Sequence, residues 1–427
     1  MQKSHVQPGG IVSPGNDVKG VVGVKYRMAA AGAAFLLSLV LCCSAFGAGF
    51  ALYDFSARGN ALGGAMVGRA DDPSAIALNP AGITQIGGSA FLGNIGFLQP
   101  FGTVDAGGLA VDQIDRTFIL PSFYYTKQMS GRTWFGLGVM PRFGLGTDFP
   151  EGWFGRYNSY RAMIESISVN PNIAWKVNDS LSLSLGVEAL WFEADLRRKI
   201  PMPGGADGDF RLKGDDIGWG WNVGLHYKMD EDTRFGLHYR SRVKLSLAGN
   251  AALTLPGGAD STGGTVDMTL PEMFMFGISR QLTPKLNVEA GAIYTGWSSY
   301  DTLTIAFDRP FLGVDSISSP KNWGNVWRYQ LGFEYNYSPE WTWRLGYTYD
   351  QEPMPDANLD YLLPTGDRQL ISIGFGYKKN NWALDLAYTR LISGDRNFRA
   401  RPGEGIPDSR SRDMGADILL LSYSVRF

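Results

Sequence analysis

Few side chains in this sequence have the types and spacing that suit catalysis or metal binding. The 427-residue chain contains three histidines, and one of them, His5, lies near its start. His226 and His238 flank a short polar segment, so these two could become neighbours in the fold. No Ser/His/acid arrangement or metal-ligand spacing accompanies them, and the sequence has no glycine-rich phosphate-binding motif. We therefore predict no enzyme active site, no metal and no cofactor, and we expect both histidines to line an interior.

The charged residues that remain are balanced. Lys and Arg number 39, Asp and Glu number 41, and the formal net charge at pH 7 is -2, so nothing indicates a nucleic-acid partner. Charged residues make up 19% of the chain, less than the roughly 25% typical of soluble domains. The mean hydropathy of -0.11 excludes a protein with many membrane helices. It does not exclude a membrane β-barrel, whose apolar and polar residues alternate.

One apolar stretch, residues 28–46, has the organisation of a secretory signal. Lys25 and Arg27 precede it, and small residues close it at the positions that a signal peptidase reads. We predict cleavage before Ala48. A single membrane anchor is the alternative, and the small-residue cleavage site favours the signal.

The leader is expected to comprise residues 1–47. Residues 1–23 show no apolar pattern and resemble an over-extended gene start, which would place the true start near Val24. Cys42 and Cys43 both lie within the leader. The mature chain is therefore expected to contain no disulfide.

From about residue 88 onward, the chain repeats long segments in which apolar and polar residues alternate. In residues 181–191, the odd-numbered positions are apolar and most even-numbered ones are small or polar. Such a period of two predicts β-strands with one apolar face. The last segment ends in an aromatic residue, Phe427. This ending resembles the C-terminal signature by which the barrel-assembly machinery recognises outer-membrane barrels.

Short polar turns alternate with longer connections between these segments. The turns are expected at 129–132, 177–180, 229–232, 282–285, 338–340 and 379–381. The longer connections are expected near 102–115, 144–160, 198–209, 249–265, 307–322, 352–367 and 394–412. These connections predict a 14-stranded antiparallel transmembrane β-barrel over 88–427, with both ends on the periplasmic side. A large soluble sandwich or propeller is the alternative, and the export signal favours the outer membrane.

Residues 48–87 break this alternation and are rich in small residues. Ser56 is suited to cap one short helix, and Pro73 to open another that ends near Asn79. A small helical segment ahead of a barrel of this size fits inside its lumen as a hatch, or plug. A periplasmic extension is the alternative.

Several short motifs, in order along the mature chain, resemble the FadL family of outer-membrane transporters of long-chain fatty acids and related hydrophobic compounds. They begin with Ala48-Gly49-Phe50-Ala51-Leu52 and Asn79-Pro80-Ala81. They continue through Trp153-Phe154-Gly155-Arg156-Tyr157, Gly218-Trp219-Gly220-Trp221, Leu270-Pro271-Glu272-Met273, Trp327-Arg328-Tyr329-Gln330 and Leu363-Pro364-Thr365-Gly366-Asp367-Arg368. Each match is short, but their shared order covers nearly all of the mature chain.

The resemblance implies a barrel closed by an N-terminal hatch, with a hydrophobic site near the mature N-terminus. It also implies a kink in the third strand, here about 132–143, that opens a side portal for lateral release. Gly136, Gly138 and Pro141 lie in that strand, and Pro and Gly weaken strand pairing. Ordinary barrel bends are the alternative for the same residues. The ligands would be fatty acids or other hydrophobic molecules, which the protein would carry past the lipopolysaccharide leaflet without an energy source.

The resemblance also selects site residues. Arg198 matches an arginine of the family's interior carboxylate site, and Lys321 lies near the position of its lysine partner. Arg328 and Arg368 match arginines of the barrel wall. Charges that only line a polar lumen are the alternative for all of them. Phe50 is expected at the ligand, while Asn79, Pro80 and Ala81 are expected to shape the hatch and its gating.

Two departures from the family pattern leave the ligand open. The connection at 198–209 is short and the one at 249–265 is modest, so the outer groove that the family builds there is expected to be reduced or absent. An acid that precedes Arg328 in the family is replaced by Asn325. Aromatic hydrocarbon uptake, a general porin and an outer-membrane enzyme therefore remain alternatives to fatty-acid transport.

Overall fold

The computed structural model describes residues 1, 49–202, 205–255 and 257–427. All of these except Met1 belong to one compact unit, which comprises Cys42–Phe427. The expected leader and its cleavage site therefore lie outside the described residues, apart from Met1. None of the helices in the described ranges is long and apolar enough to cross a membrane.

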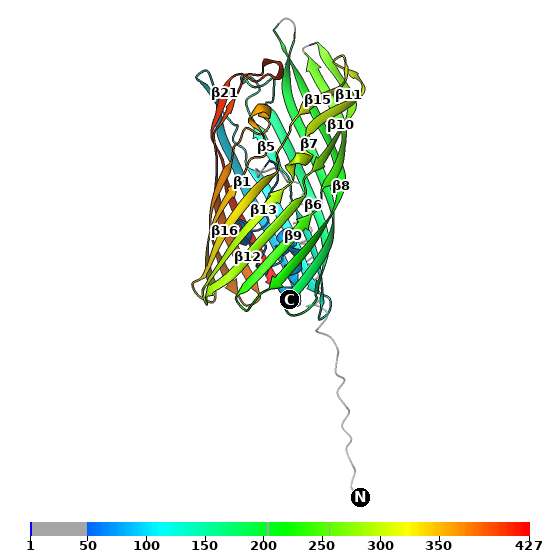
Figure 1. Ribbon diagram of the computed structural model, residues 1–427. Helices are drawn as coiled ribbons and strands as arrows, with labels where there is room; N and C mark the ends of the chain where they lie inside the picture. The colour runs from blue at the N-terminus through cyan, green and yellow to red at the C-terminus, as the bar shows by residue number, and fades with distance from the viewer. Residues whose placement is uncertain (2–48, 203–204, 256) are drawn as a thin grey trace. The chain divides into compact units, whose positions relative to one another are not determined.

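The described residues after the hatch are mostly β-strand (Figure 1). The strands are β1 (Ser89–Ala106), β2 (Leu109–Asp112), β3 (Phe118–Gln128), β4 (Thr133–Met140), β5 (Leu145–Asp148), β6 (Arg161–Lys176), β7 (Leu181–Pro201), β8 (Asp207–Lys228), β9 (Thr233–Arg240), β10 (Val243–Leu255), β11 (Gly258–Leu270), β12 (Met273–Thr283), β13 (Leu286–Thr295), β14 (Thr302–Phe311), β15 (Val314–Pro320), β16 (Val326–Asn336), β17 (Trp341–Asp350), β18 (Arg368–Lys379), β19 (Trp382–Ser393), β20 (Arg396–Phe398) and β21 (Ser409–Arg426). Short 3-10 turns lie in the connections at η2 (Trp297–Ser299), η3 (Asp356–Asn358) and η4 (Pro402–Glu404).

These strands form a closed antiparallel barrel of 14 membrane-crossing strands, as predicted. Five of the 14 are interrupted along their length and consist of β4 with β5, β9 with β10, β11 with β12, β13 with β14, and β15 with β16. The last strand, β21, closes the barrel on β1 from Ala90↔Arg426 onward. This pairing of the first strand with the last removes the two free edges that an open sheet would expose to lipid.

The two faces of each strand differ as the alternation predicts. On β18, Ile371 and Ile373 are about half exposed (48% and 55%), whereas Ser372 between them is buried. On β7, Leu185 is exposed and Glu188 is buried. An apolar row that faces outward while polar groups face inward reverses the order of a soluble protein, because lipid replaces water outside the barrel.

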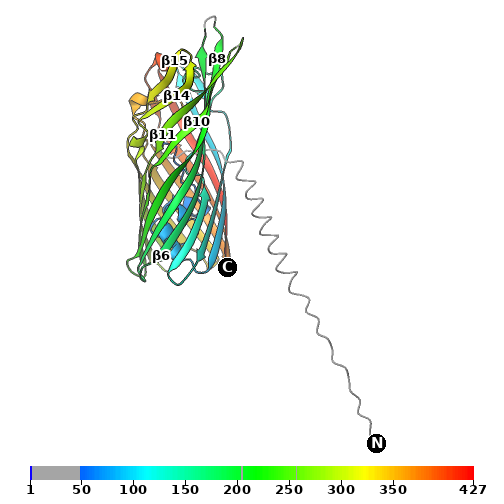
Figure 2. The ribbon, with the colours of Figure 1, turned by 90° about the vertical axis from the view of Figure 1, so that its right-hand side faces the viewer.

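The expected short turns are confirmed, and they lie at the barrel end that carries the C-terminus (Figure 1). At the opposite end, the loops expected at 198–209, 249–265 and 307–322 are mostly strand, so that expectation was wrong. Hairpins β7–β8, β10–β11 and β14–β15 extend this end of the barrel, and β7–β8 and β10–β11 project furthest (Figure 2). A small apolar cluster holds these hairpins together, and it contains Phe210, Ala251, Leu253 and Phe311. Because this apolar packing stabilises the hairpins, strand pairing continues through segments whose Gly and Asp content had predicted loops.

The hatch, described from Gly49 to Gly87, fills the lumen with short helices. They are α2 (Ala57–Ala61), α3 (Ala75–Leu78) and η1 (Pro80–Gln85). Ser56 caps α2 by accepting a hydrogen bond from the Gly59 amide, as its sequence position predicts. Almost every hatch residue is buried by the surrounding strands.

The third barrel strand is interrupted between β4 and β5. The β3–β4 ladder ends at Phe123↔Val139. Beyond this point, β5 pairs with β6 from Leu145↔Ile164, and no pairing joins it to β3 in the described residues. The interruption, residues 141–144, begins with Pro141, which cannot donate to a ladder.

Candidate ligand cavity

The start of the hatch pairs with this interruption. The Leu52 amide donates to the Arg142 carbonyl at 2.8 Å, and the Gly144 amide donates to the Phe50 carbonyl at 2.8 Å. These two bonds flank an antiparallel bridge between Ala51 and Phe143. The hatch thus supplies the partner that β3 does not provide, and it covers the gap from inside.

Phe50 then lies at the centre of an aromatic cluster. Five rings have centroids within 6.3 Å of its own, and they belong to Phe143, Phe192, Trp297, Tyr300 and Trp323. Most of these pairs are tilted or edge-to-face, the arrangements that aromatic quadrupoles favour. The cluster fixes Phe50 by contacts from four separate parts of the wall.

A glycine is required directly before Phe50. Gly49 has a φ of +56°, and a Cβ there would lie 2.5 Å from Trp323 and 2.8 Å from Trp297. A side chain at this position would therefore displace the aromatic cluster.

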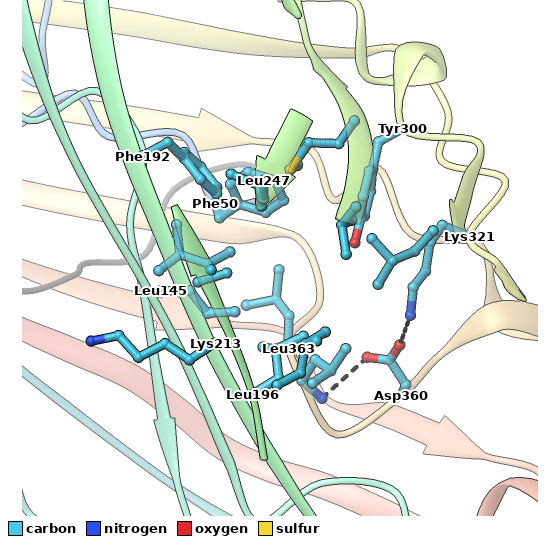
Figure 3. A pocket seen from close by; sticks show the side chains of 18 of the residues that line it. Phe50, Leu145, Phe192, Leu196, Lys213, Leu247, Tyr300, Lys321, Asp360 and Leu363 are labelled. Carbon is cyan, nitrogen blue, oxygen red and sulfur yellow. Dashed lines mark hydrogen bonds and ion pairs between the residues drawn. The ribbon is translucent and has the colours of Figure 1, made fainter. Parts of the chain in front are cut away.

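An inner cavity opens beside Phe50, with about 790 Å³ of empty space when the part that opens to solvent is included. Leu145 of β5, Phe192 and Leu196 of β7, Leu247 of β10 and Leu363 line it (Figure 3). A lining that is apolar with few polar groups is typical of pockets that bind small hydrophobic ligands. Because Leu145 begins β5, the cavity reaches the interruption in the wall.

The charged groups of this lining are paired. Lys321 donates to Asp360 at 2.7 Å, and both side chains are buried. The Leu362 amide donates to the other oxygen of Asp360 at 3.1 Å (Figure 3). Lys213 points away from the cavity and pairs with Glu193 at 3.0 Å.

Arg198 does not reach this cavity and lines an adjoining outer pocket. Its guanidinium lies 5.5 Å from the centroid of the Phe210 ring. No carboxylate pairs with it in the described part of the chain. The two spaces share a wall that includes Leu196, Lys321 and Asp360. The expectation of a reduced or absent outer groove is therefore revised, because the extended hairpins build a pocket with an unpaired cation.

Arg328 and Arg368 line neither space. Arg328 pairs with Asp350 at 2.9 Å and lies 4.5 Å from the centroid of the Tyr53 ring. Arg368 pairs with Glu352 at 2.9 Å rather than with its sequence neighbour Asp367. From the barrel wall, Arg328 contacts the hatch at Tyr53, and Arg368 binds the loop that contains Glu352.

The Asn79-Pro80-Ala81 segment fixes the hatch to β8 of the barrel wall. The Asn79 amide donates to the carbonyls of Val67 at 2.9 Å and Leu225 at 3.0 Å, and its oxygen accepts from the Ala81 amide. Pro80 opens η1, where a missing amide hydrogen has no cost.

Gly136 and Gly138 do not form the interruption. Both pair regularly within β4, and each lies against the hatch. A Cβ on Gly138 would lie 2.9 Å from Ile76, and one on Gly136 would lie 3.0 Å from Ile76 and from Ile83. Because these two glycines have no side chain, α3 and η1 can pack directly against β4.

Glu188 links the interruption to the hatch. It pairs with Arg142, which lies in the interruption, and with Arg240 at 3.6 Å. Arg240 in turn donates to the Ile76 and Ala77 carbonyls of α3 at 3.0 and 3.2 Å. All three charged side chains are at most 2% exposed. Sequence reasoning missed this triad, because no local spacing relates its members.

A second, polar cavity lies beneath the hatch at the short-turn end. It has about 1260 Å³ of empty space, including part that opens to solvent. Ion pairs line it, in which Glu334 joins Arg58, Arg69 and Arg344, and Arg344 joins Asp385. Charges of both signs therefore hold this face of the hatch.

His226 contacts the hatch, and His238 contacts the neighbouring strand β8. His226 lies 3.4 Å from Gln85, and His238 lies 3.4 Å from Asn222. The described residues contain no group of three or more His, Cys, Asp or Glu side chains placed to hold a metal.

A closed barrel with a hatch in its lumen, an apolar cavity above the hatch and an interruption in the adjacent wall defines a plugged outer-membrane transport barrel. A family model described as "Outer membrane protein transport protein (OMPP1/FadL/TodX)" matches residues 38–427. The chain therefore belongs to this family and is an outer-membrane transport protein.

Relatives support the same assignment. The long-chain fatty acid transport protein of Salmonella typhi is 26% identical over 381 residues, which cover 80% of this chain and 86% of the relative. A FadL homologue from Pseudomonas aeruginosa has the same fold, with a TM-score of 0.79, 22% identity, and coverage of 89% of this chain and all of that one. The Ralstonia pickettii toluene transporter TbuX matches with a TM-score of 0.71 and 21% identity over 88% of this chain and 99% of its own.

Proposed function

We propose that this protein transports long-chain fatty acids or similar hydrophobic compounds passively across the outer leaflet and releases them sideways through the wall. The observation that carries the proposal is the inner cavity, whose apolar lining runs from Phe50 to Leu145 at the interruption. An apolar tail that enters this cavity is removed from water, which favours binding by about 0.8 kcal/mol per buried CH₂ group.

The proposed route begins in the outer pocket. There Arg198 offers an unpaired guanidinium to the carboxylate of an acidic ligand, while Leu196, Leu212 and Leu303 lead from this pocket to the inner cavity. Charge-assisted hydrogen bonds make a guanidinium a suitable group for holding a carboxylate. The ligand then passes Phe50 and leaves at residues 141–144.

The polar cavity below the hatch supports the lateral direction. A hydrophobic ligand that continued straight down would have to cross the ion pairs around Glu334 and Arg344. An apolar group gains no favourable burial free energy there, and it would separate polar groups from their partners. The interruption offers the lipid phase instead. The same hatch opposes a general porin, because its residues fill the lumen.

The proposal includes no chemical conversion of the ligand and no cofactor. It places the loops at the lipopolysaccharide side and the short turns in the periplasm. The exposed C-terminal Phe427, paired through its backbone with Ser89, is proposed as the residue that the barrel-assembly machinery reads.

Flux into liposomes tests this function. Wild-type protein is expected to pass labelled oleate and toluene but not a small sugar, whereas deletion of residues 49–87 is expected to admit the sugar. Sugar flux through the wild type without uptake of either hydrophobic compound would refute the proposal.

The role of Arg198 is tested by comparing the binding of oleate and toluene. Arg198→Ala is expected to weaken oleate binding more than toluene binding, because only oleate carries a carboxylate. Equal effects on both ligands would remove Arg198 from the route while leaving the cavity in place.

A further inference from the structure

The inner cavity contains one buried cation, and that cation is already neutralised. Lys321 and Asp360 are 2.7 Å apart, with side chains 6% and 8% exposed. The second oxygen of Asp360 accepts the Leu362 amide, so the carboxylate is held in place by its own loop. A buried pair of this kind presents almost no net charge to a ligand beside it.

The other polar groups of the lining add no charge to the cavity. The Lys213 amine points away and pairs with Glu193. The Tyr300 ring points its hydroxyl into the space on the side of Lys321 and Asp360 (Figure 3). A neutral hydroxyl is therefore the hydrogen-bonding group that this lining turns toward a ligand, among the residues the structure describes.

A carboxylate in this cavity would be poorly accommodated. It would lose its hydration in an apolar enclosure, and it would lie close to Asp360, which has the same charge. An uncharged molecule of the same length loses little hydration and fills the same space. The unpaired cation, Arg198, belongs to the outer pocket.

We propose that the inner cavity selects uncharged hydrophobic molecules, and that Asp360 is the residue that determines this specificity by neutralising Lys321. This inference rests on the proposed function, because it assigns a ligand class to the same cavity. An acidic ligand then keeps its carboxylate at Arg198 in the outer pocket and passes inward only when its charge is neutralised.

Equilibrium binding of labelled decanol and decanoate tests the selection. Full-length protein in nanodiscs carries Arg198→Ala in every sample, so that the outer cation cannot contribute, and empty nanodiscs correct for lipid partitioning. At about pH 8, where decanoate is ionised, decanol is expected to bind about tenfold more tightly than decanoate. Equal affinities would overturn the inference.

Freeing the lysine should remove the preference for decanol. Asp360→Asn is expected to raise decanoate affinity about tenfold, the size of a hydrogen bond to a charged group, and to leave decanol affinity within about threefold. Adding Lys321→Met to Asp360→Asn should abolish the gain in decanoate affinity. If Asp360→Asn acted only by loosening the loop, the gain would remain. A gain that survives Lys321→Met, or an equal shift for both ligands, would overturn the inference.

Two controls separate the possible failures. Asp356→Asn lies in the same loop, but its side chain is 87% exposed and pairs with Arg396 outside the cavity, so it should change neither affinity. Ala194→Phe fills the cavity and should abolish decanol binding. If decanol binding survives Ala194→Phe, the proposed function itself fails. If Ala194→Phe abolishes decanol binding but the protein without that change binds decanoate and decanol with equal affinity, only the charge selection fails.

Discussion

The apolar cavity above the hatch and the polar cavity below it differ in almost every property that matters for a ligand. The inner cavity above the hatch is lined by leucines and aromatic rings around Phe50, and its one buried ion pair is compact. The cavity below is lined by a network in which Glu334 serves three arginines. The comparison shows how one hatch performs two tasks: its start forms an apolar wall, and its helices are fixed by charges.

This contrast also explains why the interruption lies where it does. Residues 141–144 lie level with the apolar cavity, and they pair with the start of the hatch rather than with β3. A gap at the polar level would expose ion pairs to lipid, where unpaired polar groups cost several kcal/mol. The apolar level is therefore where a barrel can be opened sideways at least cost.

The largest expected effect comes from the charges that join the interruption to the hatch. Glu188→Leu leaves Arg142 and Arg240 buried without their carboxylate, which is expected to destabilise the hatch by about 3–5 kcal/mol. Hydrogen exchange of the α3 amides measures this change.

Glu193→Leu is the matched control for that substitution. Glu193 lies on the same strand, but it pairs with Lys213, whose side chain is 44% exposed. Its loss is expected to cost less than about 1 kcal/mol. Similar exchange rates in the two variants would show that the buried triad does not hold the hatch.

A smaller effect is expected where the hatch meets β4. Gly138→Val places a Cβ within 2.9 Å of Ile76 and is expected to destabilise the hatch by about 1–3 kcal/mol through overpacking. Ion leakage through planar bilayers should rise, because the displaced hatch seals the lumen less well. Gly131→Ala, in a turn with nothing within 4 Å, should leave the leakage at the wild-type value.

The smallest expected effect is a pH dependence from Asp54. Burial raises the pKa of this hatch carboxyl from 3.8 to about 6, against the lowering influence of Arg328 and Asn60. Between these two values the folded hatch binds more protons than the unfolded one, so its stability falls as pH rises. From about pH 5 to 7 the loss is about 1 kcal/mol. Asp54→Asn should abolish this slope in hydrogen exchange of α2; an unchanged slope would assign the dependence to another group.

The sequence predicted the barrel well because strand alternation is a local property. The outward row of β7 and the six short turns depend on residues that are neighbours in the chain. The outer hairpins were mistaken for loops, since their pairing depends on a cluster around Phe210 and Phe311 that only the fold assembles.

The candidate site was less predictable for the same physical reason. Lys321 meets Asp360 across 39 residues and Arg328 meets Asp350 across 22, so no spacing identified either partner. Gly138 could be found as a glycine in a strand, but its contact with Ile76 belongs to the hatch. The resemblance predicted Phe50 and Lys321 separately as ligand-binding residues, and the structure brings both to the inner cavity.

A reversible cross-link provides the tool for testing lateral release. Ala51 and Phe143 form a non-hydrogen-bonded antiparallel pair, whose Cα separation of about 4.5 Å suits a disulfide. Ala51→Cys with Phe143→Cys therefore locks the hatch to the interruption when oxidised. The control is Ser56→Cys with Ser74→Cys, whose hydroxyl oxygens are 3.0 Å apart within the hatch.

The decisive measurement is toluene and oleate flux into liposomes for these two cross-linked proteins, before and after reduction. We expect the oxidised 51–143 link to stop both fluxes, reduction to restore them, and the 56–74 link to change neither. Undiminished flux through the oxidised 51–143 protein would show that hydrophobic ligands do not leave through the interruption.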